Sequence, residues 1–339
     1  MMQDIVAIWL SLLACLAVIG FAGARLSRYG DIIAEKSGLS RGWIGLTLLA
    51  TITSLPELVT GLSAVTIAQA PDIAMGDILG SCVFNLFIIV LLDFLHRKES
   101  IYTRAHQGNV LSAGYGVVLI GFVGFNLLLY RDASFPSLGH VGLYTPIILL
   151  LYPVVMRSLY RYEKEQFSQY VEERTELYPE TSLKQAAQGF ALASIAVVAA
   201  GIWLPFIAKD LAQAMAWEQS FVGTLFVAAV TSAPEVAVTL AALRLGAVDL
   251  AIGNLLGSNL FDILLVAIDD LAYLPGPLLA EVSTSHAASA FSAMMMSGLA
   301  VVGLLLRPAS RVVRTVSWIS LLLLVIYLLN TLFLYLYGH

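Results

Sequence analysis

Ten apolar stretches alternate with short polar connections along the chain. A transmembrane helix needs about 20 consecutive, mostly apolar residues. The stretches that meet this requirement are 5–24, 43–68, 73–95, 108–130, 141–159, 188–207, 221–243, 250–272, 286–306 and 312–336. Residues 160–187 form the only long hydrophilic segment, which we interpret as a solvated, partly helical linker. The pattern predicts an all-α, polytopic membrane protein with ten transmembrane helices.

Composition supports a membrane protein and excludes a water-soluble one. The chain is 59% hydrophobic and only 12% charged, whereas soluble domains carry about 25% charged residues. Cys15 and Cys82 both lie inside apolar runs, so we expect buried, unpaired side chains rather than a disulfide framework. The sequence has no basic patch of the kind that binds nucleic acid. The expected partner surface is the lipid bilayer.

The first apolar stretch could be a signal peptide, because Ala22-Gly23-Ala24 resembles a cleavage site. Signal peptides begin with basic residues, however. Here Asp4 precedes the stretch, and Arg25 and Arg28 follow it. We therefore expect a retained first helix with its N-terminus outside.

The positive charges predict how the spans are oriented. If the connections between spans are numbered in order, every Lys and Arg except Arg131 and Lys209 lies in an odd-numbered connection or at the end of a span that borders one. Loops rich in Lys and Arg stay in the cytoplasm. The sequence therefore predicts a multi-pass protein of the plasma (inner) membrane, with both termini extracellular or periplasmic and the linker 160–187 in the cytoplasm.

Two pairs of motifs repeat along the chain. Residues 53–57 read TSLPE and residues 231–235 read TSAPE, while residues 72–85 read DIAMGDILGSCVFN and residues 249–262 read DLAIGNLLGSNLFD. The spacing between partners is the same for both pairs to within one residue. The copies lie on spans 2 and 3 and on spans 7 and 8, five spans apart, so they enter the membrane from opposite sides.

Inverted repeats of this kind are typical of secondary transporters, which bind their substrate at the bilayer midplane between the halves. We therefore expect one membrane domain built from two inverted five-helix repeats, 1–159 and 188–339, joined by the linker 160–187.

The repeated glutamates, Glu57 and Glu235, fall near the middle of spans 2 and 7. A charge at that depth costs at least about 2.5–3.5 kcal/mol, so such residues are functional candidates. The alternative is a neutral carboxylic acid that hydrogen-bonds to a neighbouring helix.

Hydroxyl groups and prolines accompany each glutamate. Residues three and four positions apart share a helix face. The hydroxyl residues that share a face with the glutamates are Thr53, Ser54, Thr231 and Ser232. Pro56 and Pro234 have no N–H to donate, which frees the carbonyl groups of Ile52 and Val230 for a cation. A proline kink without any ligand is the alternative.

Spans 3 and 8 add further polar groups at matched positions. These are Ser81, Asn85, Ser258 and Asp262. Gly76, Gly80, Gly253 and Gly257 accompany them, and we interpret these glycines as packing contacts. The repeated set is entirely of oxygen donors, which suits hard cations such as calcium, with sodium a second candidate for the same site. Zinc or copper would require nitrogen or sulfur ligands.

The motifs TSLPE with GDILGSCVFN, and TSAPE with GNLLGSNLFD, resemble the two alpha-repeats of the cation/calcium antiporter superfamily, in particular the prokaryotic sodium/calcium exchangers. The resemblance implies that Glu57 and Glu235 are the central calcium ligands, and that the other polar residues and carbonyl groups named above complete calcium and sodium sites. It also implies exchange of several sodium ions for one calcium ion, no cofactor, and access switched by spans 1 and 6 sliding against the remainder.

Four positions depart from the family pattern. Ile52 and Val230 stand where the family usually has glycine, and Asp77 and Cys82 stand where it has asparagine. Antiport of calcium or another divalent cation against protons therefore stays open as an alternative. Asp77 either faces the site or is a solvated acid at the outer end of span 3. Because it lies only about five residues into that span, where an acid suits the N-terminal helix dipole, we expect the solvated position.

Two further function classes are disfavoured. An intramembrane protease would need a paired Asp, a Ser/His pair or an HExxH motif, and none is evident, so we do not expect an enzyme. Repeats inverted about a closed midplane site also argue against an open channel.

Overall fold

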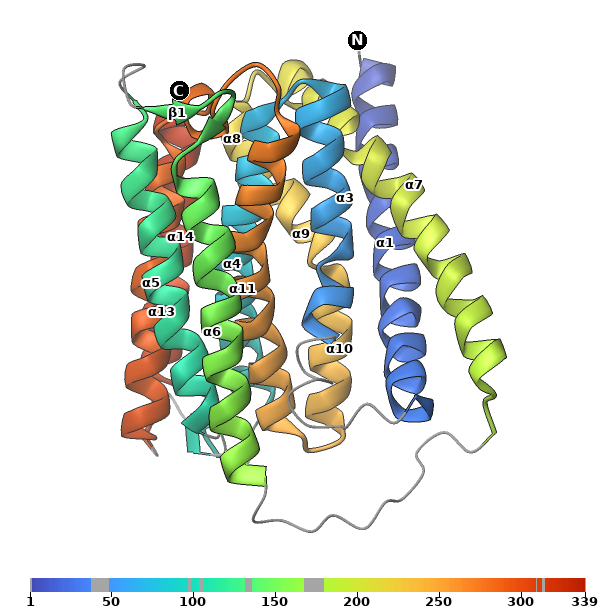
Figure 1. Ribbon diagram of the computed structural model, residues 1–339, viewed down its shortest axis with the longest axis vertical. Coiled ribbons are helices and arrows are strands. Elements are labelled where there is room, and N and C mark those ends of the chain that lie inside the picture. Colours follow the sequence, from blue (N-terminus) through green and yellow to red (C-terminus); the bar gives the residue numbers. More distant parts are fainter. Residues whose placement is uncertain are drawn as a thin grey trace.

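The computed structural model is a bundle of long helices that run up and down between two ends, with two short β-hairpins (Figure 1). It describes residues 2–37, 49–96, 99–103, 107–131, 136–167, 180–308, 310–312 and 315–338. Both termini lie at one end of the bundle, whereas the ends of α6 and α7 that flank the linker lie at the other end (Figure 1). This arrangement agrees with termini on one side of the membrane and the linker on the opposite side.

The first half of the chain contains helices and one hairpin. Its elements are α1 (Met2–Lys36), a short helical stretch over 49–53, α3 (Leu55–Ser63), the π-helix η1 (Ala64–Ala68), α4 (Pro71–Leu95), η2 (Ile101–Thr103), α5 (Gln107–Leu129), β1 (Ser137–Leu138), β2 (Val141–Gly142) and α6 (Tyr144–Phe167).

The second half has a similar succession of long helices and one hairpin, but its π-helix precedes the helix break instead of following it. Its elements are α7 (Leu183–Met215), α8 (Gln219–Val222), the π-helix η3 (Gly223–Val227), α9 (Ala228–Thr231), α10 (Ala233–Arg244), α11 (Val248–Ala272), α12 (Leu278–Glu281), α13 (His286–Leu306), β3 (Arg311–Val312), β4 (Val316–Ser317) and α14 (Trp318–Tyr337).

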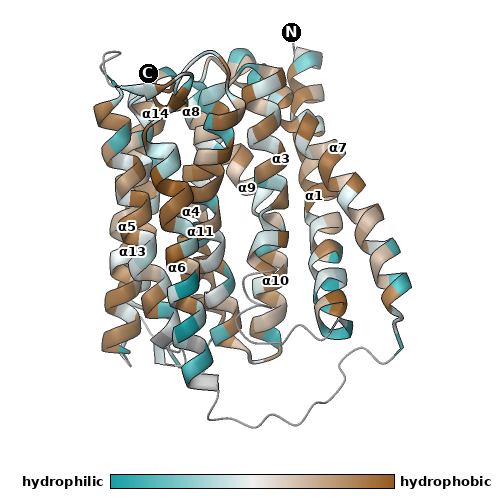
Figure 2. Cartoon of the chain, viewed as in Figure 1, coloured by the Kyte–Doolittle hydropathy of each residue, from teal (hydrophilic) through white to brown (hydrophobic). Residues whose placement is uncertain are grey.

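Within the described residues, seven helices are long and apolar enough to cross a membrane, and the bent segment from α8 to α10 makes an eighth. A helical, multi-pass membrane protein is therefore confirmed, and apolar residues predominate along the helices (Figure 2). The other two predicted spans are also helical, but one is the short apolar helix Leu55–Ala68 and the other is α6, which is charged at its lower end. The start of the span predicted at 43–68 lies outside the described residues. The count of ten spans stays a prediction.

Several predicted boundaries are wrong. The spans expected at 141–159 and 312–336 begin later, at Tyr144 and Trp318, because a β-hairpin precedes each helix. Spans 1 and 6 were expected at 5–24 and 188–207, yet α1 has 35 residues and α7 has 33. These helices continue into polar sequence because backbone hydrogen bonding does not stop where the apolar run ends.

A buried aspartate at the end of α11 holds the first hairpin in place. The Asp270 carboxylate accepts the backbone N–H groups of Gly142 at 2.9 Å and Leu278 at 2.7 Å, and the hydroxyl groups of Tyr144 and Thr145. These four donors compensate for burying a charge. The aspartate therefore fixes where α6 begins.

Asp93 occupies the equivalent position at the end of α4. Its carboxylate accepts the N–H groups of Ile101 at 3.2 Å and Ser317 at 2.6 Å, and the Ser320 hydroxyl at 2.8 Å. Ile101 follows Asp93 by the same interval as Leu278 follows Asp270. The repeat therefore extends beyond the motifs found in the sequence, and its two hairpins are anchored in the same way.

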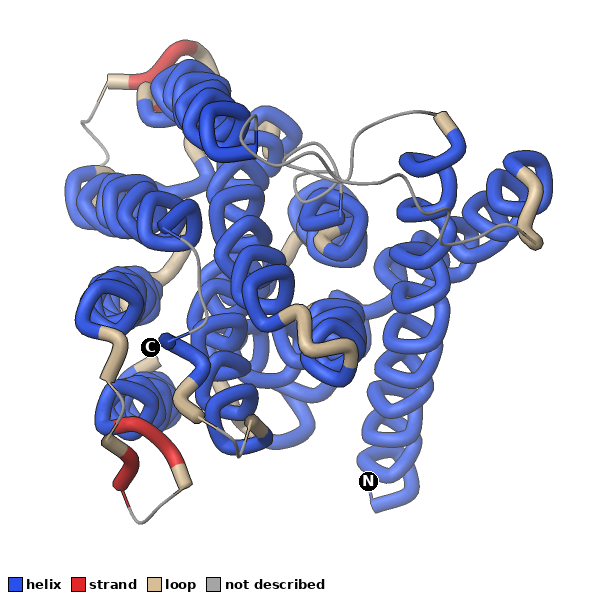
Figure 3. Tube along the Cα trace, turned by 90° about the horizontal axis from the view of Figure 1, so that it is seen from below, coloured by secondary structure: helices blue, strands red, loops and turns tan. Residues whose placement is uncertain are grey.

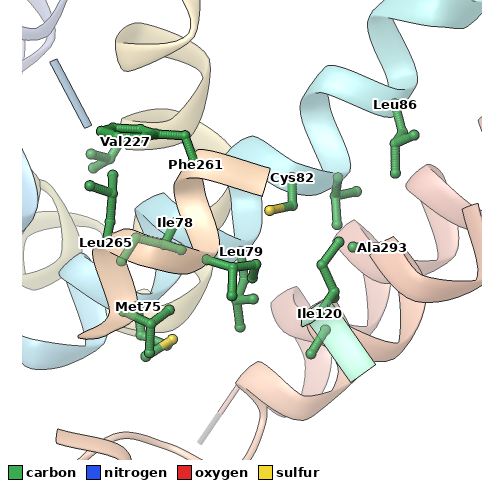
Figure 4. Close-up of a cluster of buried hydrophobic side chains, with 14 of the residues drawn as sticks. Met75, Ile78, Leu79, Cys82, Leu86, Ile120, Val227, Phe261, Leu265 and Ala293 are labelled. Carbon is green, nitrogen blue, oxygen red and sulfur yellow. The ribbon is translucent and has the colours of Figure 1, made fainter. Parts of the chain in front are cut away.

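The core of the bundle is formed by α4 and α11. Of their most apolar stretches, 72% and 78% are buried, against 22% for α1. Ile78 and Leu79 from α4 pack with Phe261 and Leu265 from α11 (Figure 4). By contrast, α1 lies at one edge of the bundle and packs along α7 (Figures 1 and 3). The chain therefore combines a tightly packed centre with a peripheral helix pair.

The motif glycines on α4 are packing contacts, as expected. A Cβ on Gly80 would lie 2.5 Å from the Thr224 carbonyl oxygen, and one on Gly76 would lie 2.9 Å from the Gly223 Cα. The absence of side chains lets α4 pack directly on the backbone of η3. Cys15 and Cys82 are buried and unpaired, which confirms that prediction as well.

Candidate functional site

The helices of spans 2 and 7 break at matched serines. Helical structure stops at Ser54 before α3 and at Ser232 before α10, and the two serines have nearly the same backbone angles, φ −85°, ψ 14° and φ −79°, ψ 9°. A proline follows two residues after each serine and removes one helical N–H. The break bends span 7 by 47°, and it places each glutamate in the first turn of a new helix, where the helix dipole favours an anion.

The two repeats exchange hydrogen bonds at this point. The Ser232 hydroxyl donates to Glu57 Oε1 at 3.2 Å, and the Ser54 hydroxyl donates to Glu235 Oε1 at 3.3 Å. Both glutamates are buried, with relative exposures of 1% and 0%. In the described part of the chain, neither Oε2 atom has a hydrogen-bond partner. Each glutamate therefore keeps one oxygen available at the boundary between the halves.

Further predicted hydroxyl groups join this centre. The Ser258 hydroxyl donates to Glu235 Oε1 at 3.3 Å and lies 3.4 Å from the Thr53 hydroxyl. On the other side, the Ser232 hydroxyl lies 3.1 Å from the Ser81 hydroxyl. Residues from four spans that are distant in sequence thus meet around the two glutamates.

Asn85 and Asp262 lie where α4 contacts α11. Asn85 Nδ2 donates to Asn259 Oδ1 at 3.0 Å, and Asn259 Nδ2 donates to the Cys82 carbonyl at 3.1 Å. The Cys82 thiol lies 3.8 Å from Asp262 Oδ2. Asn85 Oδ1 and Asp262 Oδ1 have no partner among the described atoms. Our sequence analysis did not select Asn259, although the second motif contains it at the position equivalent to Cys82.

Asp77 is part of the site, which corrects the expectation of a solvated acid. Its side chain is fully buried, and Oδ1 accepts the Thr231 hydroxyl at 2.7 Å. The position of Asp77 near the start of the span did not predict its burial, because Gly76 and Gly80 let η3 and α9 pack closely over the N-terminal half of α4. Asp77 therefore lies between helices rather than in solvent.

The carbonyl groups of Ile52 and Val230 remain predicted ligands. The residue four positions after each is a proline, so neither carbonyl can receive the usual helical hydrogen bond from that residue. Val230 is buried and Ile52 is partly buried. Both residues lie in the last turn before a helix break, next to the hydroxyl groups described above.

Four buried carboxylates therefore gather at the centre of the bundle, on Glu57, Glu235, Asp77 and Asp262. No Lys, Arg or His side chain in the described ranges hydrogen-bonds to any of them. An uncompensated buried charge is strongly unfavourable, so these groups require protons or bound cations. No cluster of three or more His, Cys, Asp or Glu that could hold a metal occurs among the described side chains. A cation here would need hydroxyl, amide or carbonyl oxygens to complete its shell.

Comparisons with known proteins agree with this geometry. A family model described as sodium/calcium exchanger protein matches residues 7–158 and 185–336. The chain is 28% identical over 273 residues to the inner membrane protein YrbG of Escherichia coli (strain K12), covering 77% of this chain and 82% of that protein. It is 26% identical over 271 residues to the sodium/calcium exchanger MaX1 of Methanosarcina acetivorans, covering 69% and 74%.

A solved structure has the same fold. The sodium-calcium exchanger NCX_Mj superposes with a TM-score of 0.61 at 22% sequence identity, over 96% of this chain and 98% of that chain. The two ranges matched by the family model correspond to the two halves on either side of the linker.

Proposed function

Because the chain belongs to the sodium/calcium exchanger protein family, we propose that it is a secondary active antiporter that exchanges calcium for sodium across the plasma (inner) membrane. The observation that carries the proposal is the reciprocal pair of hydrogen bonds, Ser232 to Glu57 and Ser54 to Glu235. It places one carboxylate from each repeat at a shared centre. Such a centre binds an ion between two halves that can open alternately.

The donor set favours calcium as one substrate. Calcium takes six to eight oxygen ligands, and the two glutamates supply two negative charges to balance it. The serine, threonine, asparagine and carbonyl oxygens can complete the shell. Sodium is also a hard cation and can use the same oxygens. MaX1 and NCX_Mj are both sodium/calcium exchangers by name, so the two ions proposed here are those of these relatives.

The edge helices α1 and α7 contact the two repeats differently. Gly23 of α1 lies against Pro234 of α10, because a Cβ there would be 2.3 Å from the proline Cγ. The equivalent glycine of α7, Gly201, lies against α3 instead, because a Cβ there would be 3.0 Å from Val59 Cγ1 and 3.3 Å from Thr60 Oγ1. In the other repeat the residue equivalent to Pro234 is Pro56. Pro56 lies about one helical turn before Val59 and Thr60, the residues that Gly201 faces.

This difference of one turn, about 5.4 Å, supports a sliding mechanism. If α1 and α7 move together by one turn along the bundle, Gly201 comes to lie against Pro56 and Gly23 leaves Pro234. The centre then opens toward the opposite side. The peripheral position of both helices leaves them free to slide, while α4 and α11 stay packed at the core.

Flux measurements on purified protein in proteoliposomes test the function. Vesicles are loaded with calcium, and an opposing sodium gradient and a proton gradient are imposed separately. Sodium-driven calcium exchange is the expected result. Exchange driven only by protons would favour the alternative, a proton-coupled antiporter of calcium or another divalent cation. The burial of Asp77 beside Thr231 is the observation that favours this alternative. Calcium movement with neither gradient would contradict antiport.

Substitution of Asp262 or Asp77 should change the dependence of exchange on the coupling ion without abolishing calcium binding. Glu57 and Glu235 suffice to balance a calcium ion, so we expect Asp262→Asn to keep calcium binding and to weaken the dependence of exchange on the coupling ion. Calcium binding and the sodium and pH dependence of exchange are measured in wild type, Asp262→Asn and Asp77→Asn. If Asp77 carries a proton, Asp77→Asn gains sodium dependence. Complete loss of calcium binding in Asp262→Asn would contradict this division of roles.

Orientation is tested by labelling single exposed cysteines with an impermeant reagent. We expect Ser137→Cys, in the first hairpin, to be labelled from outside intact cells. Glu180→Cys, just before α7, should be labelled only after the membrane is opened. The parental protein, whose Cys15 and Cys82 are buried, gives the background. The reverse pattern would overturn the proposed orientation.

A further inference from the structure

One buried carboxylate outside the central site has no donor among the described residues. Asp269 on α11 is fully buried, and neither of its carboxylate oxygens has a hydrogen-bond partner among the described residues. Its neighbour Asp270 differs, because four donors surround that carboxylate. Hairpin anchoring therefore accounts for Asp270 and leaves Asp269 without a structural partner.

Asp269 faces the helix that carries Glu57. A Cβ on Gly61 of α3 would lie 2.3 Å from Asp269 Oδ2, so the carboxylate occupies the space that a side chain there would fill. Gly61 lies one helical turn beyond Glu57. Asp269 lies two turns beyond Asp262 in the last turn of α11, and this end of α11 lies at the same end of the bundle as the termini (Figure 1).

Asp77 connects Asp269 with the centre. The charges of Asp269 and Asp77 are near enough to interact, and so are those of Asp77 and the two glutamates. Asp77 Oδ2 also has no partner within the described chain. The two aspartates therefore form a series of buried acids that leads from the end with the termini to Glu57 and Glu235.

Among the described residues, the opposite half of the bundle has no such series. By the spacing of the repeated motifs, the equivalent of Asp77 is Asn254 and the equivalent of Asp269 is Leu92. Both are buried and neither ionises. The two routes to the centre are therefore electrostatically different, although the repeat would make them alike.

We propose that Asp269, together with Asp77, forms a second binding site for the transported hard cation, occupied on the route between the central site and the membrane face that carries the termini. The inference rests on the proposed function. A cation at this site compensates the buried charge of Asp269, which has no donor of its own. The negative charge of this site also raises the local concentration of the cation beside the central site, on the route from the face that carries the termini and not on the route from the linker face.

The test measures calcium affinity separately on the two faces. Half-saturating calcium is determined for exchange in vesicles of defined orientation, with calcium added either at the face that carries the termini or at the linker face. For Asp269→Asn, which keeps the size of the side chain, we expect half-saturating calcium to rise about threefold or more at the first face and to stay unchanged at the second. Asp269→Ser should give the same sided effect.

Asp210→Asn is the matched control, because Asp210 is an exposed carboxylate near the C-terminal end of α7, which lies at the same end of the bundle as the termini (Figure 1). It should leave both affinities unchanged. Equal changes at both faces, or no change, in an Asp269 variant would overturn the second site. A shift in pH dependence without a change in calcium affinity would also overturn it and would make Asp269 a proton carrier. Absence of calcium exchange in wild type would contradict the proposed function instead.

Discussion

Glu57→Gln and Glu235→Gln should each lower calcium exchange by about ten- to a hundredfold while the protein still inserts and folds. Glutamine has almost the same size and can still accept the crossing serine hydroxyl at Oε1. It removes the charge that must balance a divalent ion. Interactions with a charged group contribute about 1.5–3 kcal/mol, and about 1.4 kcal/mol corresponds to tenfold. The measurement is sodium-driven calcium flux in proteoliposomes.

The matched control for these variants is Glu281→Gln. Glu281 lies in α12 and its side chain is exposed, so exchange should stay at the wild-type rate. Size-exclusion profiles of the purified variants establish that they are folded. Wild-type flux in a folded Glu57 or Glu235 variant would contradict the proposal that these two carboxylates, one from each repeat, bind the ion.

Gly23→Ala should slow exchange at least about tenfold. The added Cβ would lie 2.3 Å from the Pro234 ring, so α1 could not keep the position that it has here. The conformation with α1 against Pro234 would lose stability, and the transport cycle, which must pass through it, would slow. Exchange rate at saturating calcium is the quantity to measure, since the substitution does not touch the proposed ligands.

Gly114→Ala on α5 is the control for this prediction. A Cβ at Gly114 has no heavy atom within 4 Å, so the same chemical change should leave the rate unaltered. A Gly23→Ala protein with wild-type exchange would show that α1 does not need its close contact with α10. The sliding mechanism would then lose the observation that supports it.

The span from 286 to 306 illustrates what could be predicted well, because its boundaries agree with those of α13. It contains no Asp, Glu, Lys or Arg and polar residues flank it, so its length follows from the thickness of the bilayer. The hairpins before α6 and α14 could not be predicted in this way. They exist because Asp270 and Asp93, far away in sequence, supply acceptors for their N–H groups.

The sequence by itself determined that this is a helical membrane protein, that two motif pairs repeat, and that Glu57 and Glu235 are matched acids within apolar helices. These conclusions depend on hydrophobic length and on spacing along one chain. Only the tertiary structure decided that Ser232 reaches Glu57, that Asp77 is buried against Thr231, and that Asp269 has no hydrogen-bond partner among the described residues. Each of these facts is a contact, or a missing contact, between helices, and the depth of a residue along its own span does not specify which helix packs over it.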